Sequence, residues 1–137
     1  DMRHFQDMIS ELGLDEKFSL TGWLPPKQAR EEVSACDLII HYSKWDVLPT
    51  AILEAMALGK PVIGSRTVDQ IIDGKTGYVV HDENELFERT CELLDSGRLR
   101  AAMGRAARET VERDYNLPNL ISRLETFYAG NISSQKT

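Results

Sequence analysis

Two carboxylates, Asp46 and Glu54, lie eight positions apart in the segment SKWDVLPTAILEAMAL. A carboxylate accepts two hydrogen bonds side by side, which suits neighbouring hydroxyls such as those of a ribose. The two side chains could therefore bind a sugar-containing ligand at two points, one on a loop and the other on the helix that follows.

Between these two acids, Pro49 marks the start of a helix, because proline is well tolerated in a first helical turn. The backbone N–H groups of Thr50, Ala51 and Ile52 would then have no partner within the helix. Together with the helix dipole they would form a site for an anion such as a diphosphate. Glu54 lies one turn further on, on the same helix face as Thr50.

A second interpretation of these acids stays open, because most helix glutamates are solvated and most loop aspartates form caps or turns. The residues around Glu54 are apolar nearly all round, from Ala51 to Leu58, which predicts a buried helix. A charge on a buried helix needs a partner. That partner could be a ligand, or the nearby Lys60 or Arg66.

Helical and strand-like segments alternate along the chain, and most of the strand-like runs are apolar throughout. The expected helices cover residues 2–12, 26–36, 49–58, 83–95, 99–113 and 117–128, and the expected strands cover 18–21, 38–40, 61–64 and 77–80. Asp82, followed three residues later by Glu85, resembles a capping box at the start of one helix. The arginines of the late helices favour a solvated helix face.

This alternation predicts an α/β fold, with a Rossmann-like parallel sheet flanked by helices on both faces. In such sheets ligands bind at the carboxyl ends of the strands. The length of 137 residues suits one domain, which we expect over residues 1–129, followed by a flexible tail over 130–137.

Composition excludes several classes of function. A net charge of −6 argues against nucleic-acid binding, and no apolar run is long enough to cross a bilayer. No His/Cys/Asp cluster has the spacing of a metal site, so we expect no metal. Cys36 and Cys91 lie in helical patterns and favour small buried side chains, which is typical of a protein in the reducing cytoplasm.

The run from Phe18 to about Tyr128 resembles the C-terminal domain of the retaining glycosyltransferases of family 4, also called group 1, which use nucleotide sugars and adopt the GT-B fold. The matching segments occur in the family's order: FSLTGW, ACDLIIHYS, LEAMALGKPVIGS, DGKTGYVV and MGRAARETV. The resemblance implies transfer of a sugar from a nucleotide diphosphate to an acceptor hydroxyl with retention, and without a cofactor.

The family's acidic signature is two glutamates separated by seven residues, and Asp46 and Glu54 match this spacing. The resemblance implies that Glu54 contacts the nucleotide ribose. It implies that Asp46, the catalytic-site residue, anchors hydroxyls of the donor sugar and is not a covalent nucleophile. Main-chain groups of Thr50 and Ala51 would hold the diphosphate.

The resemblance also implies partners for the chain and places a further contact at the nucleotide base. Gly22 and Trp23 are weaker candidates for donor binding beside the base. The expected partners are the nucleotide sugar, an acceptor (a saccharide, a lipid-linked molecule or a small molecule), and the missing N-terminal domain. The intact enzyme would be cytoplasmic or peripheral to the membrane.

The chain departs from the family pattern in several places. Asp46 is one methylene shorter than the usual glutamate, Val47-Leu48 replaces Gly-Phe, and residues 66–70 form a connection about three residues short. The family has two further strands before Met2, which bring an arginine and a lysine to the diphosphate.

We therefore expect a fragment that binds donor weakly and is inactive alone. The alternative is a non-catalytic regulatory or scaffolding module that kept the fold.

Overall fold

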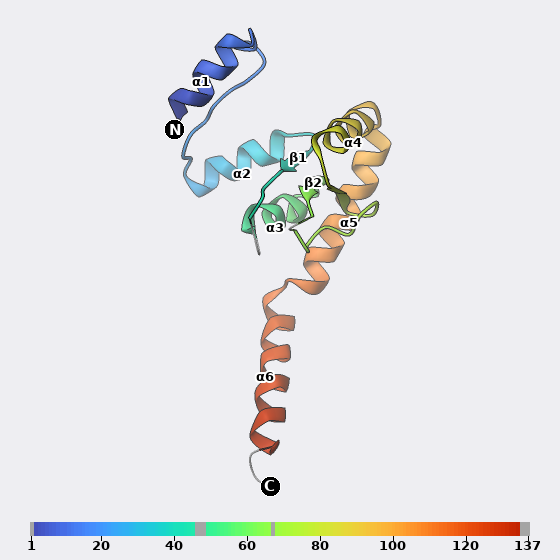
Figure 1. Ribbon diagram of the computed structural model, residues 1–137. Coiled ribbons are helices and arrows are strands. Elements are labelled where there is room, and N and C mark those ends of the chain that lie inside the picture. Colours follow the sequence, from blue (N-terminus) through green and yellow to red (C-terminus); the bar gives the residue numbers. More distant parts are fainter. Residues whose placement is uncertain (1, 46–48, 67, 135–137) are drawn as a thin grey trace. The chain divides into compact units, whose positions relative to one another are not determined.

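The computed structural model describes residues 2–45, 49–66 and 68–134 (Figure 1). The chain divides into two compact units, Asp1–Glu32 and Val33–Thr137. The expectation of one domain over residues 1–129 stays a prediction. None of the helices in the described ranges combines the length and the apolar character that crossing a bilayer requires.

The first unit contains α1 (Met2–Glu11) and most of α2 (Pro26–Ala35), as the apolar spacing and Pro25-Pro26 predict. Gly13 follows α1 with a φ of 66°, and its N–H donates to the Ser10 carbonyl over 3.0 Å. The strand predicted at residues 18–21 is wrong, because none of the described residues forms a ladder with this segment. Apolar alternation alone does not make a strand without a neighbour to accept its hydrogen bonds.

The second unit contains a parallel sheet of three described strands in the order β1-β2-β3. These strands are β1 (Ile39–His41), β2 (Val62–Ser65) and β3 (Gly77–Val80). In the register, Ile39 lies opposite Val62, and Val62 lies opposite Gly77. The α/β class and the parallel sheet predicted from the sequence are confirmed.

Both faces of the sheet are covered, as the continuous apolar strands predict. Val62 of β2 packs with Ile52 and Met56 of α3 (Thr50–Ala57) on one face. The next residue, Ile63, packs on the other face with Leu93 of α4 (Glu83–Asp95). Side chains alternate between faces along a strand, so one short strand serves two cores.

The long helix α5 (Gly97–Asp114) joins both cores, through Ala107 on one side and Met103 on the other. It also lies against the end of α3, where Gly59 has a φ of 71° and its N–H donates to the Met56 carbonyl. A Cβ atom built on Gly104 would lie 2.0 Å from the Gly59 carbonyl oxygen. Two glycines therefore allow the backbones of α3 and α5 to touch.

The predicted capping box at α4 is confirmed, because the Asp82 carboxylate accepts the Glu85 N–H over 2.9 Å. The last helix, α6 (Leu117–Ser134), runs beyond the predicted end at residue 128. The predicted burial of the two cysteines is wrong, because Cys36 is exposed and Cys91 is half-buried.

Candidate functional site

The N-terminus of α3 is open in the described structure. Pro49 precedes the helix with extended dihedral angles, and none of the described side chains caps it. Thr50 and Ala51 are exposed, so their backbone N–H groups face a surface that a ligand can reach. The prediction that the Ile52 N–H has no partner is wrong, because this group donates to the Pro49 carbonyl over 3.0 Å.

Glu54 lies on the exposed face of α3, one turn after Thr50. The helix buries Ile52, Ala55 and Met56, and it exposes Glu54. The prediction that α3 is buried all round is therefore wrong, and so is the argument that Glu54 needs a partner to offset burial. Among the described residues no cation pairs with Glu54, and its assignment to the ribose stays a prediction.

The other predicted site residues divide into two groups. Asp46 lies outside the described residues. Gly22, with a φ of 62°, and the exposed Trp23 belong to the first unit, whereas α3 belongs to the second. Thr50, Ala51 and Glu54 are therefore the predicted site residues that the described part of the second unit contains.

A cavity of about 380 Å³ lies at the carboxyl end of the sheet in this second unit. It is formed by the residues that end or follow β1, β2 and β3. Its described lining residues are Tyr42, Ser43, Lys44, Trp45, Ser65, Arg66, Val80 and His81. This is the edge of a parallel sheet at which ligands ordinarily bind.

Two serine hydroxyls join the chain segments after β1 and β2 at this cavity. The Ser65 hydroxyl donates to the Ser43 carbonyl over 2.5 Å and accepts the Ser43 N–H over 3.3 Å. The Ser43 hydroxyl accepts the Trp45 N–H over 3.3 Å. The bonds hold the β1 loop on the end of β2, so the position of Lys44 between Ser43 and Trp45 is constrained.

Two carboxylates of α4 lie at the rim of the cavity, and each binds a lining residue. The Tyr42 hydroxyl donates to Glu83 over 3.3 Å. The pKa of Tyr42 is raised, mainly by partial burial and secondly by this carboxylate. Glu85 accepts the His81 backbone N–H over 2.9 Å and contacts His81 Nδ1 at 3.0 Å. The pKa of Glu85 is lowered, mainly by the hydrogen bond from the His81 backbone and secondly by the contact with the imidazole.

Lys44 and His81 were not predicted as site residues from the sequence, and Arg66 was predicted only as a possible partner of Glu54. Their positions in the sequence could have identified them, because each of these residues follows the end of a strand by one to three residues. In a parallel sheet those ends meet at one edge.

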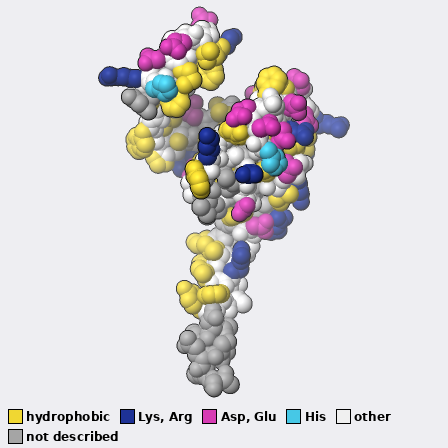
Figure 2. Space-filling view, viewed as in Figure 1, with side chains coloured by type: hydrophobic (Ala, Val, Ile, Leu, Met, Phe, Trp, Pro, Cys, Tyr) yellow, Lys and Arg dark blue, Asp and Glu magenta, His cyan; other side chains and the backbone are white. Residues whose placement is uncertain are grey.

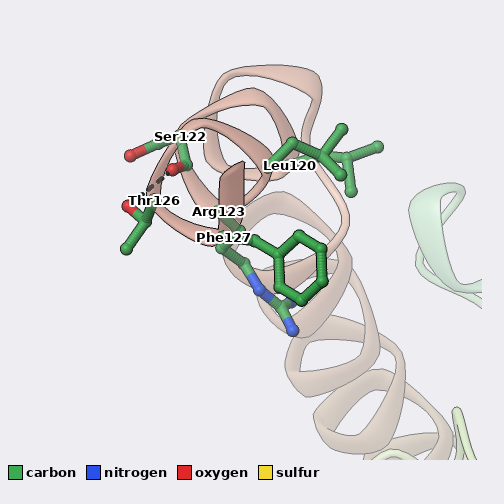
Figure 3. Close-up of a pocket in the computed structure, with 6 residues that line it drawn as sticks. Leu120, Ser122, Arg123, Thr126 and Phe127 are labelled. Atoms are coloured by element: carbon green, nitrogen blue, oxygen red, sulfur yellow. Dashed lines mark hydrogen bonds between the residues drawn. The ribbon is translucent and has the colours of Figure 1, made fainter. Parts of the chain in front are cut away.

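A larger cavity, of about 590 Å³, lies in the second unit, and all of its described lining residues belong to α6. Figure 3 shows Leu120, Arg123 and Phe127 projecting from this single helix, with the Thr126 hydroxyl bonded to the Ser122 carbonyl. Figure 2 shows hydrophobic side chains along the same helix. The exposed members are Leu117, Leu120, Ile121, Leu124, Phe127 and Tyr128. This groove belongs to an apolar helix face and brings together no residue of the predicted site.

Within the described ranges, no group of three or more His, Cys, Asp or Glu side chains is placed to hold a metal ion. The described lining of the cavity offers hydroxyls, backbone amides and cations, which are groups that bind polar ligands.

Comparison with known sequences gives a consistent result. The profile of the family described as "Glycosyl transferases group 1" matches residues 2–110. The chain is 31% identical over 127 residues to trehalose synthase of Thermococcus litoralis, covering 88% of this chain and 31% of that protein. It is 29% identical over 138 residues to N-acetyl-alpha-D-glucosaminyl L-malate synthase of Bacillus anthracis, covering 97% and 33%.

Solved structures share the fold. The crystal structure of Anabaena Alr3699/HepE in complex with UDP superposes with a TM-score of 0.84 at 18% identity, covering 94% of this chain and 36% of that one. The chain thus spans about a third of the length of the relatives it matches.

Proposed function

Because the chain belongs to the glycosyl transferases group 1 family, we propose that it is the donor-binding part of a glycosyltransferase. The whole enzyme transfers a sugar from a nucleotide diphosphate to an acceptor hydroxyl, with retention of configuration. The donor is a nucleotide sugar, and no metal or other cofactor takes part.

One observation carries this proposal: the start of α3 is exposed and uncapped, with a carboxylate one turn further along the same face. The N–H groups of Thr50 and Ala51 are suited to phosphate oxygens, whose charge the helix dipole also favours. The Glu54 carboxylate is suited to the two hydroxyls of a ribose. A nucleoside diphosphate carries both groups.

The relatives support the same chemistry. The two similar proteins are a trehalose synthase and an N-acetyl-alpha-D-glucosaminyl L-malate synthase, and the superposed Anabaena structure is a complex with UDP. The protein's contribution to such a reaction is to position the substrates and to stabilise the negative charge that develops on the departing diphosphate.

The test is a titration of the isotope-labelled chain with UDP, followed by amide chemical shifts, because this readout detects weak binding. We expect UDP to shift the amide signals of Thr50 and Ala51, whereas uridine, which lacks phosphate, leaves them in place. No shift at these amides up to millimolar UDP contradicts donor binding by this chain and favours the regulatory or scaffolding module.

A pair of substitutions tests Glu54 separately. We expect Glu54→Ala to raise the Kd for UDP about tenfold, through loss of hydrogen bonds to a charged group. Glu88→Ala is the matched control, since Glu88 is an exposed glutamate on α4. Equal affinities of the two variants would remove Glu54 from the site.

A further inference from the structure

The Gln70 side chain is buried without a hydrogen-bond partner among the described residues. The residue is 2% exposed, and neither the oxygen nor the nitrogen of its amide bonds to any described group. A side-chain amide can accept two hydrogen bonds and donate two. Burial of such a group without those bonds costs free energy, which an apolar side chain of similar size would not cost.

The segment that carries Gln70, residues 68–72, is part of the connection between β2 and β3. Val68 and Ile71 are 3% and 6% exposed, and both belong to the core cluster that includes the buried face of α3. A Cβ atom built on Gly64 of β2 would lie 2.6 Å from Ile71 Cδ1. The absence of a side chain at Gly64 therefore leaves the space in which this segment packs.

Two hydrogen bonds hold the ends of this segment. The Val68 N–H donates to the Ser65 carbonyl over 3.1 Å, and the Ile72 N–H donates to the Thr76 hydroxyl over 2.8 Å. Apolar packing holds the middle of the segment in the core. The amide of Gln70 opposes this packing, because it has exchanged water for an environment without a described partner.

We propose that residues 68–72 open from the core as a local unit, and that the unpaired amide of Gln70 lowers the free energy of this opening. The amide lacks partners while the segment is packed, and water supplies them once the segment opens. Local openings occur in short stretches that few bonds and contacts hold in place. The segment is therefore a conformational device within the second unit.

The opening changes the packing around α3. Val68 and Ile71 leave the core with the segment, which uncovers part of the buried face of this helix. The contact of Gly59 with Gly104 of α5 stays in place, because neither glycine belongs to the segment. The opening thus loosens the core around α3 without releasing the helix, and the proposal does not rest on donor binding there.

The experiment is amide hydrogen exchange of the isotope-labelled chain, followed residue by residue with and without low concentrations of urea. We expect the Val68 and Ile72 amides to exchange faster than the Ile63 amide of β2. Their rates should respond little to urea, because a local opening exposes little surface. Exchange of all three amides with the same dependence on urea would mean that the segment opens only through global unfolding, and would overturn the proposal.

Substitution of Gln70 identifies the role of its amide. We expect Gln70→Met, which keeps an unbranched side chain of similar length, to slow exchange of the Val68 and Ile72 amides about tenfold. Gln70→Leu repeats the test with a second apolar side chain, in case methionine packs poorly. Gln28→Met is the matched control, because Gln28 is exposed on α2. Unchanged or faster exchange in both Gln70 variants overturns the proposal, and so does an equal slowing in the control.

Thr76 provides a comparison in which the expected change has the opposite sign. Its buried hydroxyl accepts the Ile72 N–H over 2.8 Å and donates to the Ile72 carbonyl over 3.4 Å. Because Thr76→Val removes a polar group that has partners, we expect the Val68 and Ile72 amides to exchange faster in this variant. Slower exchange in Thr76→Val would show that any apolar substitution tightens the segment, and would overturn the role of the unpaired amide.

Discussion

The Tyr78 hydroxyl is the polar end of a mostly buried side chain in β3. It donates to Glu92 over 2.8 Å, and Arg89 lies over the ring at 4.6 Å from its centroid. Arg89 also donates to Glu92 over 2.8 Å. The pKa of Tyr78 is raised above its usual 10.0, mainly by burial and secondly by the Glu92 carboxylate. Three side chains thus form one small network at the edge of the second core.

This raised pKa predicts how Tyr78 contributes to stability as pH changes. A folded-state pKa above the unfolded value gives stability that is complete below pH 10 and is lost as pH rises further. We expect Tyr78→Phe to lower the free energy of unfolding by about 1 kcal/mol at pH 8. The difference in unfolding free energy between this variant and the native chain should shrink above pH 10. Urea unfolding at pH 8 and at pH 11 measures it.

Tyr115→Phe is the control for this prediction, because the Tyr115 side chain is exposed and forms no described hydrogen bond. A Tyr78→Phe difference that stays constant from pH 8 to pH 11 would show that the hydroxyl does not titrate as the structure implies.

Single residues were predictable from the sequence where their role is local. Asp82 caps α4 through an N–H three residues away, so the pattern alone located it. The exposure of Glu54 was not predictable in this way, because the apolar residues around it do not reveal which helix face the rest of the chain covers. The same limit applies to Arg100, which was expected on a solvated face.

At the scale of the elements, Arg100 joins three segments. Its guanidinium donates to the carbonyls of Leu93 and Leu94, over 2.6 and 2.7 Å, at the end of α4. It also pairs with Asp37, just before β1, at 3.1 Å. One side chain therefore satisfies the open end of one helix and ties it to the start of a strand.

The contact between α3 and α5 gives a sharp prediction. A Cβ atom at Gly104 would lie 2.0 Å from the backbone oxygen of Gly59, which cannot move as a side chain could. We expect Gly104→Ala to lower the free energy of unfolding by about 3 kcal/mol, the upper part of the usual range for overpacking. Denaturant unfolding measures this change.

Gly97→Ala is the matched control on the same helix. The nearest atom to its added Cβ would be Arg100 Nη2, at 3.8 Å, which is an ordinary contact. We expect this variant to be as stable as the native chain or slightly more stable. Comparable losses in both variants would show that the alanine effect at Gly104 is not a collision with the α3 backbone.

The strands β1 to β3 were predictable because each is short, apolar and bounded by turn residues. The segment 18–21 has a similar appearance in the sequence yet forms no described strand. A strand forms only beside a neighbouring strand that accepts its hydrogen bonds, and the residues of the segment alone do not identify that neighbour.

At the scale of the whole chain, the two units differ in burial. No described residue of 2–32 is buried. Met2, Phe5 and Met8 of α1 are exposed, and so is Leu12 just after the helix. The second unit holds both apolar cores. An isolated helix as short as α1 is only marginally stable in water.

Hydrogen exchange of the 137-residue chain tests this difference. We expect the amides of α1 to exchange at nearly unprotected rates, since little burial opposes their opening. The amides of β2 should exchange only through global unfolding, because all four residues of this strand are buried. Equal protection of α1 and β2, measured by mass spectrometry, would contradict the difference in burial.

The fold class and the family were predictable because ordered motifs and apolar strands are carried by contiguous residues. The set of residues that lines the cavity was not predictable, since these residues come from three separate strand ends. Such groups meet only after the sheet has formed, and the one sign of their proximity in the sequence is that each follows the end of a strand.

The touching backbones of Gly59 and Gly104 anchor one end of α3. The opposite end, at Thr50, is free to meet a ligand. Because Ile52 and Met56 are also packed in the core, α3 is held along its buried face as well as at its end, so a ligand at Thr50 would meet a helix that the fold has already fixed in place.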